Sequence, residues 1–420
     1  MSREIVDIFD ISYEGAGVGK IDGQVVFVPK ALPGEQVEIE IVRRGSNFMI
    51  GEVCQVLKPS EYRIEPECPY YDFCGGCCFQ HCDEDAEEQL KIQILKDEIK
   101  KAGYVGEVDF VDSDKRLGYR NKIKLDVQND KLGFYRQKSR EFVEIDQCLL
   151  ADEEMNEALA DAREFLRNNK FRFAKSVYVK RVEDDIAIVF LFAKEDPQSQ
   201  KNFKNIDILQ KYAVYFAFGE YLESNDTKLM GINAYRKLEY NYHDHKLQVN
   251  VAGFNQVNNY VADRLYEYVV ELTQNKRVVN AYSGQGFLTY LISNNAKFVY
   301  GIEYQLAAHK MAEKVKEWNE NYKITNICGK VEDVLPQVML RDRIDTIVLD
   351  PARDGCHKNV LDTIKKNDIR EIIYISCNFA TLTRDLGVLG DNYEIVEVTV
   401  FNMFPCTANM ETVAILHRKS

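Results

Sequence analysis

The sequence predicts an α/β protein built from three parts. A small all-β part covers residues 1–58, a mixed α+β part covers residues 59–243, and a doubly wound α/β domain covers residues 244–420. Two observations lead to this division. Short β-branched runs separated by glycines fill the beginning of the chain, whereas apolar strand-like runs alternate with helical patterns from about residue 245 onward. A chain of 420 residues is long enough for two or three such domains.

The first 58 residues have the pattern of a small β-barrel. Residues 24–29 and 35–41 alternate between apolar and polar side chains or are β-branched, as half-buried strands are. Glycines mark the turns between such runs, at Gly15, Gly17, Gly19, Gly23 and Gly34. This length and spacing fit a barrel of the OB type.

The middle part begins with a cysteine-rich stretch, residues 59–82, which shows little regular structure. Residues 83–102 then predict a helix, because apolar residues recur among charges at near-helical spacing. These apolar residues are Leu90, Ile92, Leu95 and Ile99. We expect that this helix is able to pack on the C-terminal domain. Strands and helices follow, including a helix near residues 152–168.

The C-terminal domain alternates predicted strands with predicted helices. The strand-like runs are residues 277–280, 298–302, 344–349, 372–375 and 412–416. A helix is predicted between two of them, at residues 305–319. This order is typical of an open, mostly parallel sheet covered by helices, in which ligands bind at the carboxyl ends of the strands.

Polar residues follow two of these buried runs at the point where each ends. Asp350 begins the sequence Asp-Pro-Ala-Arg, and Cys377 lies in the sequence Ser-Cys-Asn. A thiol at the ligand-binding edge of the sheet, beside an acid on a neighbouring strand, indicates a nucleophile. A lone cysteine is more often a packing residue, and Asp350 before a proline is also a common helix start. The neighbouring motifs favour catalysis.

A glycine-rich turn predicts a cofactor site in the same domain. Ser283, Gly284, Gln285 and Gly286 follow the first strand, and Glu303 ends the next one. Such a turn lets a cofactor approach the backbone, and an acid at the second strand end accepts hydrogen bonds from ribose hydroxyls. A dinucleotide and S-adenosylmethionine both fit this pattern. The dinucleotide is the weaker fit, because Thr289 occupies the place of the third glycine.

A metal site is predicted in the cysteine-rich stretch. Cys68, Cys74 and Cys77 have the spacing C-x5-C-x2-C, which serves iron–sulfur clusters or zinc. Three thiolates need a fourth ligand, and Cys78 and Cys82 are the nearest candidates in the sequence. Eleven cysteines in a chain without a recognisable signal peptide favour metal binding or catalysis over disulfides.

Composition limits the class of protein. No apolar run approaches the length of a membrane span, and we expect a cytoplasmic protein. The net charge of −13 argues against a nucleic-acid partner overall. Residues 115–140, however, hold nine basic and two acidic residues, interleaved with Tyr119, Phe134 and Tyr135. Basic and aromatic side chains together are typical of a surface that binds single-stranded RNA, although the segment considered alone favours a solvated hairpin face.

Taken together, these motifs resemble the RNA uracil-5-methyltransferase family, and specifically its ribosomal-RNA branch with an N-terminal TRAM domain. The resemblance covers essentially the whole chain. The matching segments are residues 1–58 (the TRAM barrel), 68–81 (the cluster motif), 119–122, 254–258, 350–353, 376–378 and 407–413. It implies an OB-type barrel, a central domain with a cysteine cluster, and a Rossmann-like methyltransferase domain.

The resemblance implies roles for individual residues. Cys377 would be the nucleophile and Glu411 the general base. A thiolate that adds to carbon 6 of uracil makes carbon 5 nucleophilic enough to take a methyl group, and a base must then remove the carbon 5 proton. S-adenosylmethionine would be bound by Gln256, Tyr282, Glu303 and Asp350, with Asp350 between the cofactor and the target base.

The resemblance also selects a [4Fe–4S] cluster, with Cys148 as the distant fourth ligand beside Cys68, Cys74 and Cys77. Zinc is the alternative metal. The implied substrate is a specific uridine of 23S ribosomal RNA, flipped out of any stacked structure, with transfer RNA as the alternative. We expect a monomer that makes no membrane contact.

Several residues depart from the family pattern. Phe379 stands where a proline is frequent, Cys406 and Asn409 replace histidine, and Asn280 replaces aspartate. An adenine N6-methyltransferase is disfavoured, since it would carry Asn-Pro-Pro-Tyr and needs no thiol. A non-catalytic RNA-binding iron–sulfur protein remains the competing class, although it would need neither Cys377 nor Glu411.

Overall fold

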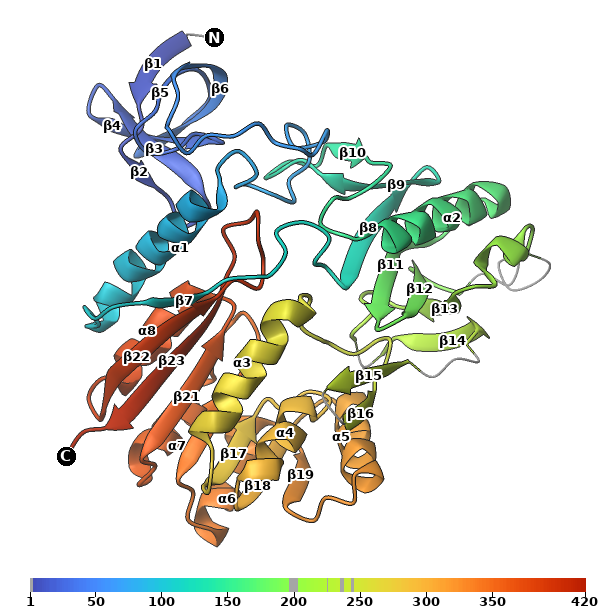
Figure 1. Cartoon of the computed structure of the whole chain (residues 1–420), viewed down its shortest axis with the longest axis vertical. Helices are drawn as coiled ribbons and strands as arrows, with labels where there is room; N and C mark the ends of the chain where they lie inside the picture. The colour runs from blue at the N-terminus through green and yellow to red at the C-terminus, as the bar shows by residue number, and fades with distance from the viewer. Residues whose placement is uncertain (1–2, 196–202, 225, 235–237, 243–244) are drawn as a thin grey trace.

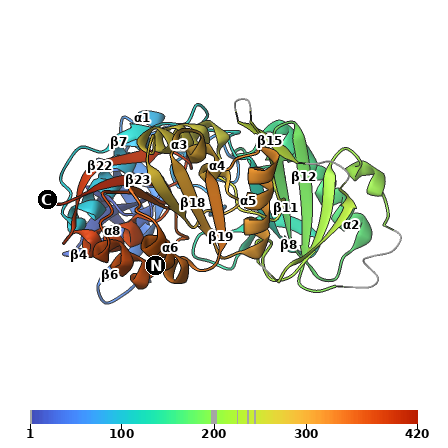
Figure 2. The same ribbon diagram turned by 90° about the horizontal axis from the view of Figure 1, so that it is seen from below.

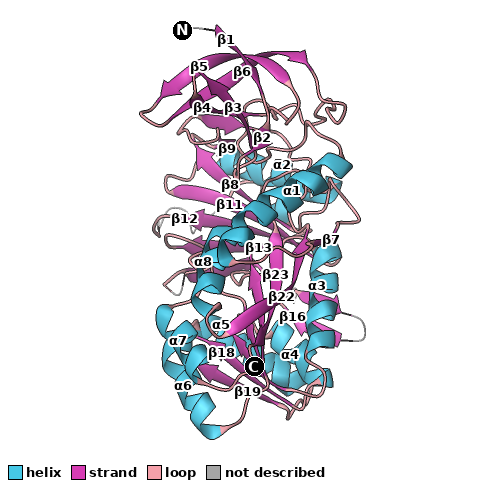
Figure 3. Cartoon of the chain, turned by 90° about the vertical axis from the view of Figure 1, so that its left-hand side faces the viewer, coloured by secondary structure: helices cyan, strands magenta, loops and turns pink. Residues whose placement is uncertain are grey.

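The computed structural model describes residues 3–195, 203–224, 226–234, 238–242 and 245–420. The N-terminal strands lie at one end of an elongated molecule (Figure 3). The C-terminal sheet and its helices lie at the other end, and the central sheet lies to one side of both (Figure 1). The predicted class, mixed α/β with an all-β beginning, is confirmed.

The N-terminal part is a six-stranded sheet with the order β1-β5-β6-β4-β3-β2. Its strands are β1 (Arg3–Asp7), β2 (Asp10–Ile11), β3 (Ala16–Ile21), β4 (Gln24–Pro29), β5 (Gln36–Arg44) and β6 (Phe48–Lys58). Alternate residues of these strands point into one apolar core, which includes Val26, Val28, Val37, Ile39 and Met49. The period-two pattern read from the sequence therefore sets which side of the sheet is buried.

Helix α1 (Glu84–Ile99) begins at Asp83, whose side chain accepts a hydrogen bond from the Ala86 amide at 2.9 Å. It continues as a 3-10 turn (Lys100–Ala102). The helix packs on the C-terminal domain as expected, because Ile94, Leu95 and Ile99 join the apolar cluster under α8. Strand β7 (Asp109–Val111) then pairs with the C-terminal sheet in parallel.

A buried charge network fastens α1 to the loop that precedes the last strand. Lys91 is 0% exposed. Its ammonium group donates to Glu87 Oε1 at 2.7 Å, to Asn402 Oδ1 at 2.6 Å and to the Phe404 carbonyl at 3.1 Å. Glu87 also accepts from the Cys406 amide at 2.8 Å. Each charge has partners, which is the condition under which a buried ion pair is tolerated.

The central part is a seven-stranded sheet with the order β10-β9-β8-β11-β12-β13-β14. Its strands are β8 (Lys122–Gln128), β9 (Lys131–Tyr135), β10 (Phe142–Glu144), β11 (Ala174–Val182), β12 (Asp185–Phe192), β13 (Ala213–Phe218) and β14 (Lys228–Asn233). Helix α2 (Glu153–Asn169) covers one face through Phe165 and Leu166. A 3-10 turn (Ile206–Leu209) and a hairpin of β15 (Glu239–Tyr242) and β16 (His245–Gln248) complete this part.

The C-terminal domain is built on an eight-stranded sheet with the order β19-β18-β17-β20-β21-β23-β22-β7. Its own strands are β17 (Arg277–Ala281), β18 (Phe298–Glu303), β19 (Ile324–Cys328), β20 (Thr346–Leu349), β21 (Glu371–Ser376), β22 (Tyr393–Phe401) and β23 (Glu411–Arg418). The first five are parallel, and β23 inserts antiparallel between β21 and β22. The predicted alternation of strand and helix is confirmed.

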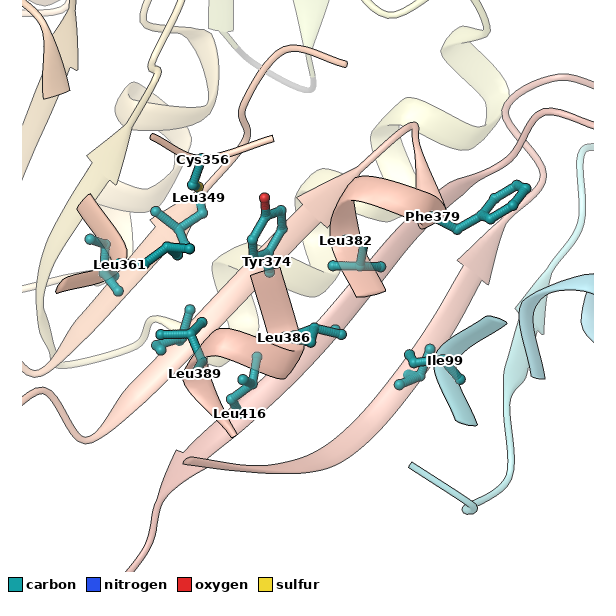
Figure 4. Packing of buried hydrophobic residues seen from close by; sticks show 14 of the residues in the cluster. Ile99, Leu349, Cys356, Leu361, Tyr374, Phe379, Leu382, Leu386, Leu389 and Leu416 are labelled. Atoms are coloured by element: carbon teal, nitrogen blue, oxygen red, sulfur yellow. The ribbon is translucent and has the colours of Figure 1, made fainter. Parts of the chain in front are cut away.

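Helices cover both faces of this sheet, as Figure 2 shows from below. They are α3 (Asn259–Leu272), α4 (Phe287–Asn295), α5 (Leu306–Trp318), α6 (Val331–Arg341), α7 (Lys358–Lys366) and α8 (Phe379–Leu389). Neighbouring strand residues face opposite layers, so that Val278 packs with α3 and α4 while Val279 packs with α1, α6, α7 and α8. Figure 4 shows the second layer, where Leu382, Leu386 and Leu389 of α8 lie against Tyr374 and Leu416.

None of the helices in the described parts of the chain has the length and apolar character needed to cross a membrane.

Replacing Lys91 with alanine should destabilise the protein strongly, because it leaves Glu87 buried without its main counter-charge. We expect the free energy of unfolding to fall by about 3–5 kcal/mol, measured by chemical denaturation. Lys96→Ala on the same helix is the matched control, since the Lys96 side chain is 38% exposed and pairs with Glu107, whose side chain is 92% exposed. Equal, small effects of the two substitutions would contradict the role assigned to the buried network.

Candidate active site

Cys377 lies at the carboxyl end of β21, in the turn that leads into α8. Asn378 caps the helix by accepting a hydrogen bond from the Ala380 amide at 3.1 Å. Ser376 Oγ accepts from the Asn378 amide at 3.2 Å and donates to the Asn378 carbonyl at 3.1 Å. The short polar motif therefore fixes the backbone on both sides of the thiol.

Strand pairing brings an acid next to this thiol. In the antiparallel pair of β21 and β23, Ser376 lies opposite Thr412, and the same register places Cys377 beside Glu411. Asp350 immediately follows β20, the other neighbour of β21. Glu411 is buried, although it is the first residue of its strand. The thiol and both carboxyl groups, which are more than 25 residues apart in the sequence, thus meet at one edge of the sheet.

Burial and mutual repulsion shift the pKa of each group in this cluster. Burial raises the pKa of the Cys377 thiol to about 11, with Glu411 and Asp350 raising it further and Arg353 lowering it. Burial raises the pKa of Asp350 to about 7. Burial, reinforced by Asp350, raises the pKa of Glu411 well above its usual value, against the lowering effect of Arg353. At neutral pH the thiol is therefore held protonated, and the two carboxyl groups resist being ionised together.

Arg353 is the cation of this cluster. Its backbone carbonyl accepts hydrogen bonds from Asn378 Nδ2 at 2.9 Å and from Thr381 Oγ1 at 3.1 Å. These hydrogen bonds connect the loop after Asp350 to the beginning of α8. The same helix start fixes the turn that carries Cys377. Because Arg353 opposes the pKa increase of both Cys377 and Glu411, it favours the ionised forms of the two groups.

A cavity of about 320 Å³ opens beside Cys377. Four separate parts of the molecule line it: the loop between β2 and β3, the cysteine-rich loop, the hairpin turn after β9, and the edge of the C-terminal sheet formed by the loops after β20, after β21 and before β23. The lining residues are Tyr13, Glu14, Gly75, Gly76, Cys77, Cys78, Gln137, Arg353, Cys377, Asn378, Phe379, Thr407, Ala408 and Asn409. Two departures from the family pattern, Phe379 and Asn409, therefore lie in its wall.

The other two departures lie outside this wall. Cys406 is buried, and its thiol contacts the Arg116 carbonyl at 3.7 Å. It is absent from the lining of the cavity, whose cysteines are Cys77, Cys78 and Cys377. Asn280 is buried in β17 and donates to Thr289 Oγ1 at 2.9 Å. It fixes the strand to α4.

The glycine-rich turn joins β17 to α4 in the way the sequence predicts. Tyr282, Gly284 and Gly286 all adopt positive φ, of 63°, 55° and 80°. At Gly286 a side chain would also collide with Ala312 of α5, since an added Cβ would lie 2.5 Å from the Ala312 Cβ. Only glycine allows α4 and α5 to approach so closely.

Glu303 is positioned by this turn. Its Oε2 accepts a hydrogen bond from the Gly284 amide at 2.9 Å, and its Oε1 accepts from the Gln305 amide at 2.7 Å. Each oxygen keeps a further lone pair for a ligand. An added Cβ at Gly284 would meet nothing within 4 Å, so the space over the turn is open. These features fit the ribose of a nucleoside cofactor.

Gln256 lies in a loop that is connected to the same turn. Gln285, in the turn, accepts from the Asn250 amide at 3.0 Å and donates to the Phe254 carbonyl and to Asn255 Oδ1, each at 2.9 Å. Gln256 itself is buried, and its carbonyl accepts from Asn121 Nδ2 at 2.9 Å. The structure thus connects Gln256 to the turn that carries Tyr282.

Sequence reasoning missed three residues that shape this site: Arg353, Gln285 and Lys180. Lys180 is buried in β11 and donates to the carbonyls of Val251 and Gly253, each at 2.9 Å. Burial lowers its pKa to about 7. Its contacts lie about 70 positions away, so no local pattern signals its role. Arg353 belongs to the Asp-Pro-Ala-Arg motif, and this position in a motif could have indicated its place in the site.

The four predicted metal ligands line one cavity. Cys68, Cys74, Cys77 and Cys148 surround a volume of about 160 Å³, together with apolar residues and Arg120. All four are free thiols. Cys148 is positioned by Asn156, which accepts from its amide at 2.8 Å and donates to its carbonyl at 3.1 Å. Burial raises the pKa of Cys74 to about 11, and the neighbouring Cys148 and Cys68 raise it further.

The two rival cysteines have other partners. Cys78 Sγ accepts a hydrogen bond from the Ala408 amide at 3.0 Å, and Cys82 Sγ donates to the Phe79 carbonyl at 3.2 Å. Neither lines the cavity of the four thiols. Within the residues that the structure describes, no group of three or more His, Cys, Asp or Glu side chains is arranged to hold a metal ion.

The basic segment 115–140 differs from the expected RNA surface. Tyr119 is buried and donates to the Pro405 carbonyl at 3.1 Å, and Phe134 packs against the central core. Many of the cations are paired: Arg116 with Glu87, Lys131 with Glu144, Arg136 with Glu52 and Lys138 with Glu14. Of the three aromatic residues, only Tyr135 is exposed. Its ion pairs mainly connect the central part of the chain to the N-terminal barrel and to helix α1.

Comparison with known proteins gives two family matches. Residues 85–419 match the model described as tRNA (uracil-5-)-methyltransferase, and residues 3–54 match the TRAM domain. An uncharacterised RNA methyltransferase of Staphylococcus aureus strain MSSA476 is 31% identical, over 98% of this chain and 97% of that protein. Another, from Caldanaerobacter subterraneus subsp. tengcongensis, is also 31% identical over the same shares.

One solved structure has the same fold over the whole length. It is the Pyrococcus abyssi tRNA (uracil-54, C5)-methyltransferase in complex with S-adenosyl-L-homocysteine. The TM-score is 0.78 at 24% identity, and the match covers 99% of this chain and 100% of that chain. At this identity the likeness establishes the fold alone.

Replacing Arg353 with glutamine should make Cys377 less reactive. Loss of the cation raises the pKa of the thiol further above 11, which lowers the thiolate fraction at pH 9. We expect alkylation of Cys377 by iodoacetamide to slow by roughly tenfold for each unit of pKa change, followed by peptide mass spectrometry. Lys365→Gln, on α7 and paired with Asp391, should leave the rate unchanged. Faster alkylation in Arg353→Gln would refute this role.

Proposed function

We propose a substrate and a mechanism for this chain, which belongs to the tRNA (uracil-5-)-methyltransferase family and carries an N-terminal TRAM domain. The chain is an S-adenosylmethionine-dependent RNA methyltransferase. Its proposed reaction is methylation of carbon 5 of a uridine in RNA through a covalent adduct with Cys377. The meeting of Cys377, Glu411, Asp350 and Arg353 at one edge of the sheet is the observation that carries this proposal.

In this mechanism, the Cys377 thiolate adds to carbon 6 of the uracil ring. The addition turns carbon 5 into an enolate-like nucleophile, which takes the methyl group that S-adenosylmethionine supplies. Glu411 removes the remaining proton from carbon 5. Elimination of the sulfur from carbon 6 then restores the double bond and frees Cys377. The thiol proton leaves to solvent before the addition, the methyl transfer releases S-adenosylhomocysteine, Glu411 takes up the carbon 5 proton, and no step is a redox step.

The shifted pKa values suit these roles. A thiol held protonated by burial does not react with other electrophiles until a substrate and Arg353 favour the thiolate. A carboxylate whose pKa is raised toward the working pH is a stronger base than an exposed one. Asp350 and Glu411 repel each other, so a proton retained by one favours ionisation of the other.

We assign the cofactor to the turn between β17 and α4. Glu303 would accept hydrogen bonds from the ribose hydroxyls through its remaining lone pairs, and Tyr282 would flank the same site. Gln256 would contact the cofactor from the loop held by Gln285 and Lys180. Asp350 would lie between the cofactor and the uracil, because it follows β20 next to both.

We propose 23S ribosomal RNA as the substrate and transfer RNA as the second candidate. The TRAM domain and its sequence resemblance to the ribosomal-RNA branch support the first. The description of the family model, and the fold shared with the Pyrococcus abyssi tRNA enzyme over its full length, favour the second. In either case residues 1–58 and 59–243 would bind RNA, residues 244–420 would carry out the chemistry, and the cytoplasm, where these RNAs are made, would be the location.

We further propose that Cys68, Cys74, Cys77 and Cys148 bind a [4Fe–4S] cluster, with zinc as the alternative. Four free thiols around one mostly apolar cavity are a donor set suited to either. The methyl transfer moves no electrons, so the cluster would supply structure. Gly76 and Cys77 line both this cavity and the one beside Cys377, which supports a role in shaping the uridine site.

Cys377→Ala should abolish methyl transfer, by roughly 10³-fold or more, because it removes the nucleophile that adds to carbon 6. Binding of S-adenosylmethionine, measured by calorimetry, should stay within about twofold, since the thiol is not part of the proposed cofactor site. Cys54→Ala, at an exposed cysteine of the barrel, is the matched control. Normal turnover by Cys377→Ala would rule out the covalent mechanism.

Glu411→Gln should trap the enzyme on its RNA. Without a base to remove the carbon 5 proton, the methylated adduct cannot eliminate, and a covalent protein–RNA complex should persist on a denaturing gel. The neutral amide keeps the size of the buried acid, so the variant should fold. Complete turnover without any adduct would assign the base to another residue.

Protein purified without oxygen should be brown and should contain about four iron and four sulfide ions per chain. Cys148→Ser should lose them, whereas Cys82→Ser should keep them because Cys82 lies outside the cavity. A colourless protein with one zinc ion per chain would replace the cluster by the zinc alternative. Loss of metal only in Cys82→Ser would contradict the ligand set.

A further inference from the structure

The cavity beside Cys377 has an aromatic wall that the proposed reaction does not use. Tyr13 comes from the loop between β2 and β3 of the barrel, and Phe379 is the first residue of α8. Their rings meet edge to face, with centroids 6.4 Å apart and planes at 75°. Both residues line the cavity that contains Cys377. Two parts of the chain more than 360 positions apart thus build one wall.

The ring of Tyr13 is exposed to an extent unusual for a large aromatic residue in a cavity. Tyr13 is 59% exposed, whereas Phe379 is 9% exposed. Figure 4 shows Phe379 at the edge of the apolar cluster, with its ring directed away from Leu382. Among the described residues, the Tyr13 hydroxyl has one hydrogen-bond contact, a long one of 3.4 Å to Glu14 Oε1. Phe379 therefore supports Tyr13 from behind, and most of the surface of Tyr13 remains available.

The position of Tyr13 is fixed by the loop that carries it. Gly15 is buried with φ of 80°, and an added Cβ there would lie 2.9 Å from Cys78 Sγ and 3.2 Å from the Ala408 Cβ. The barrel loop thus packs directly on the cysteine-rich loop and on the loop before Glu411. Because this packing holds the backbone at Gly15, the neighbouring Tyr13 ring has a fixed position in the wall of the cavity.

A cation at the same cavity suits a polyanion, because Arg353 lines it together with Cys377. The nearby Lys138 is paired with the lining residue Glu14. An exposed ring near a cation, next to the site proposed to receive one flipped base, is the composition by which proteins bind single-stranded nucleic acid.

We propose that Tyr13, supported by Phe379, is a stacking platform for the base next to the target uridine in single-stranded RNA. A uridine that leaves its stack exposes the face of its neighbour, and the Tyr13 ring covers that face at the mouth of the cavity. The platform determines RNA affinity and positioning, and it takes no part in bond formation. The inference rests on the proposed function, since it assumes that the cavity beside Cys377 receives the uridine.

The test measures stacking directly and without turnover. A single-stranded RNA oligonucleotide with 2-aminopurine next to a uridine is titrated with the protein in the absence of S-adenosylmethionine. Fluorescence should be quenched on binding, and Tyr13→Ala should lose the quenching and weaken binding by about tenfold. Tyr13→Phe should restore both, because the hydroxyl has only its long contact to Glu14.

Phe9→Ala is the matched control, because Phe9 is an equally exposed aromatic residue of the barrel, at 56%, that does not line the cavity. It should bind and quench like the unmodified protein. Phe379→Leu, which keeps an apolar residue behind Tyr13, should weaken both signals less than Tyr13→Ala. Circular dichroism and S-adenosylmethionine affinity should be unchanged in all four variants.

The outcomes separate this inference from the proposed reaction. Equal binding and quenching by Tyr13→Ala and the unmodified protein would overturn the platform, even if methylation proceeds normally. Loss of quenching in Tyr13→Ala alone would support the platform, even if no RNA is methylated. In an RNA that does accept methyl groups, the platform predicts a raised KM for Tyr13→Ala with kcat nearly unchanged.

Discussion

The antiparallel register between β21 and β23 is the constraint on which the candidate active site depends. Because Ser376 lies opposite Thr412, the residue after Ser376 and the residue before Thr412 meet, which brings Cys377 beside Glu411. A slip of one residue would turn Glu411 toward the other face of the sheet. The register is held by strand residues that alternate between two buried layers, such as Ile372 and Ile373. Packing on both faces of the sheet thus determines that Cys377 and Glu411 lie side by side at its edge.

The loop before Glu411 is fastened by parts of the chain that are distant in sequence. Lys91 and Glu87 on α1 hold its backbone, and Cys78 in the cysteine-rich loop accepts a hydrogen bond from Ala408. The barrel loop packs on the same place through Gly15. The barrel, the cysteine-rich loop and the proposed general base therefore share one support, so binding of RNA or of the proposed cluster at those parts would position Glu411 without contact to the reacting atoms.

The sequence predicted features that depend on local pattern. Cys377 and Asp350 each end a buried apolar run, so their place at the sheet edge followed from chain topology. Contacts between distant segments did not follow. The three-residue strand β7 is too short to recognise and pairs with β22 nearly 290 positions later. The sequence pattern suggested that Tyr119 stacks on RNA bases. Its buried hydrogen bond to the Pro405 carbonyl could not be foreseen, because the two residues are equally far apart in the sequence. The assignments of Glu411 and Cys148 needed the family resemblance.

Methyl transfer from labelled S-adenosylmethionine to RNA, followed by analysis of the modified nucleoside, tests the central claim most directly. Unmodified ribosomal RNA and transfer RNA are offered to the protein as separate pools. We expect label in 5-methyluridine and in no other nucleoside, with ribosomal RNA as the pool that responds. Label in 5-methyluridine of transfer RNA alone would change the assigned substrate to transfer RNA and would leave the proposed reaction unchanged. Label in another nucleoside, or no transfer to either pool by protein with bound cofactor, would contradict the assignment of Cys377 and Glu411.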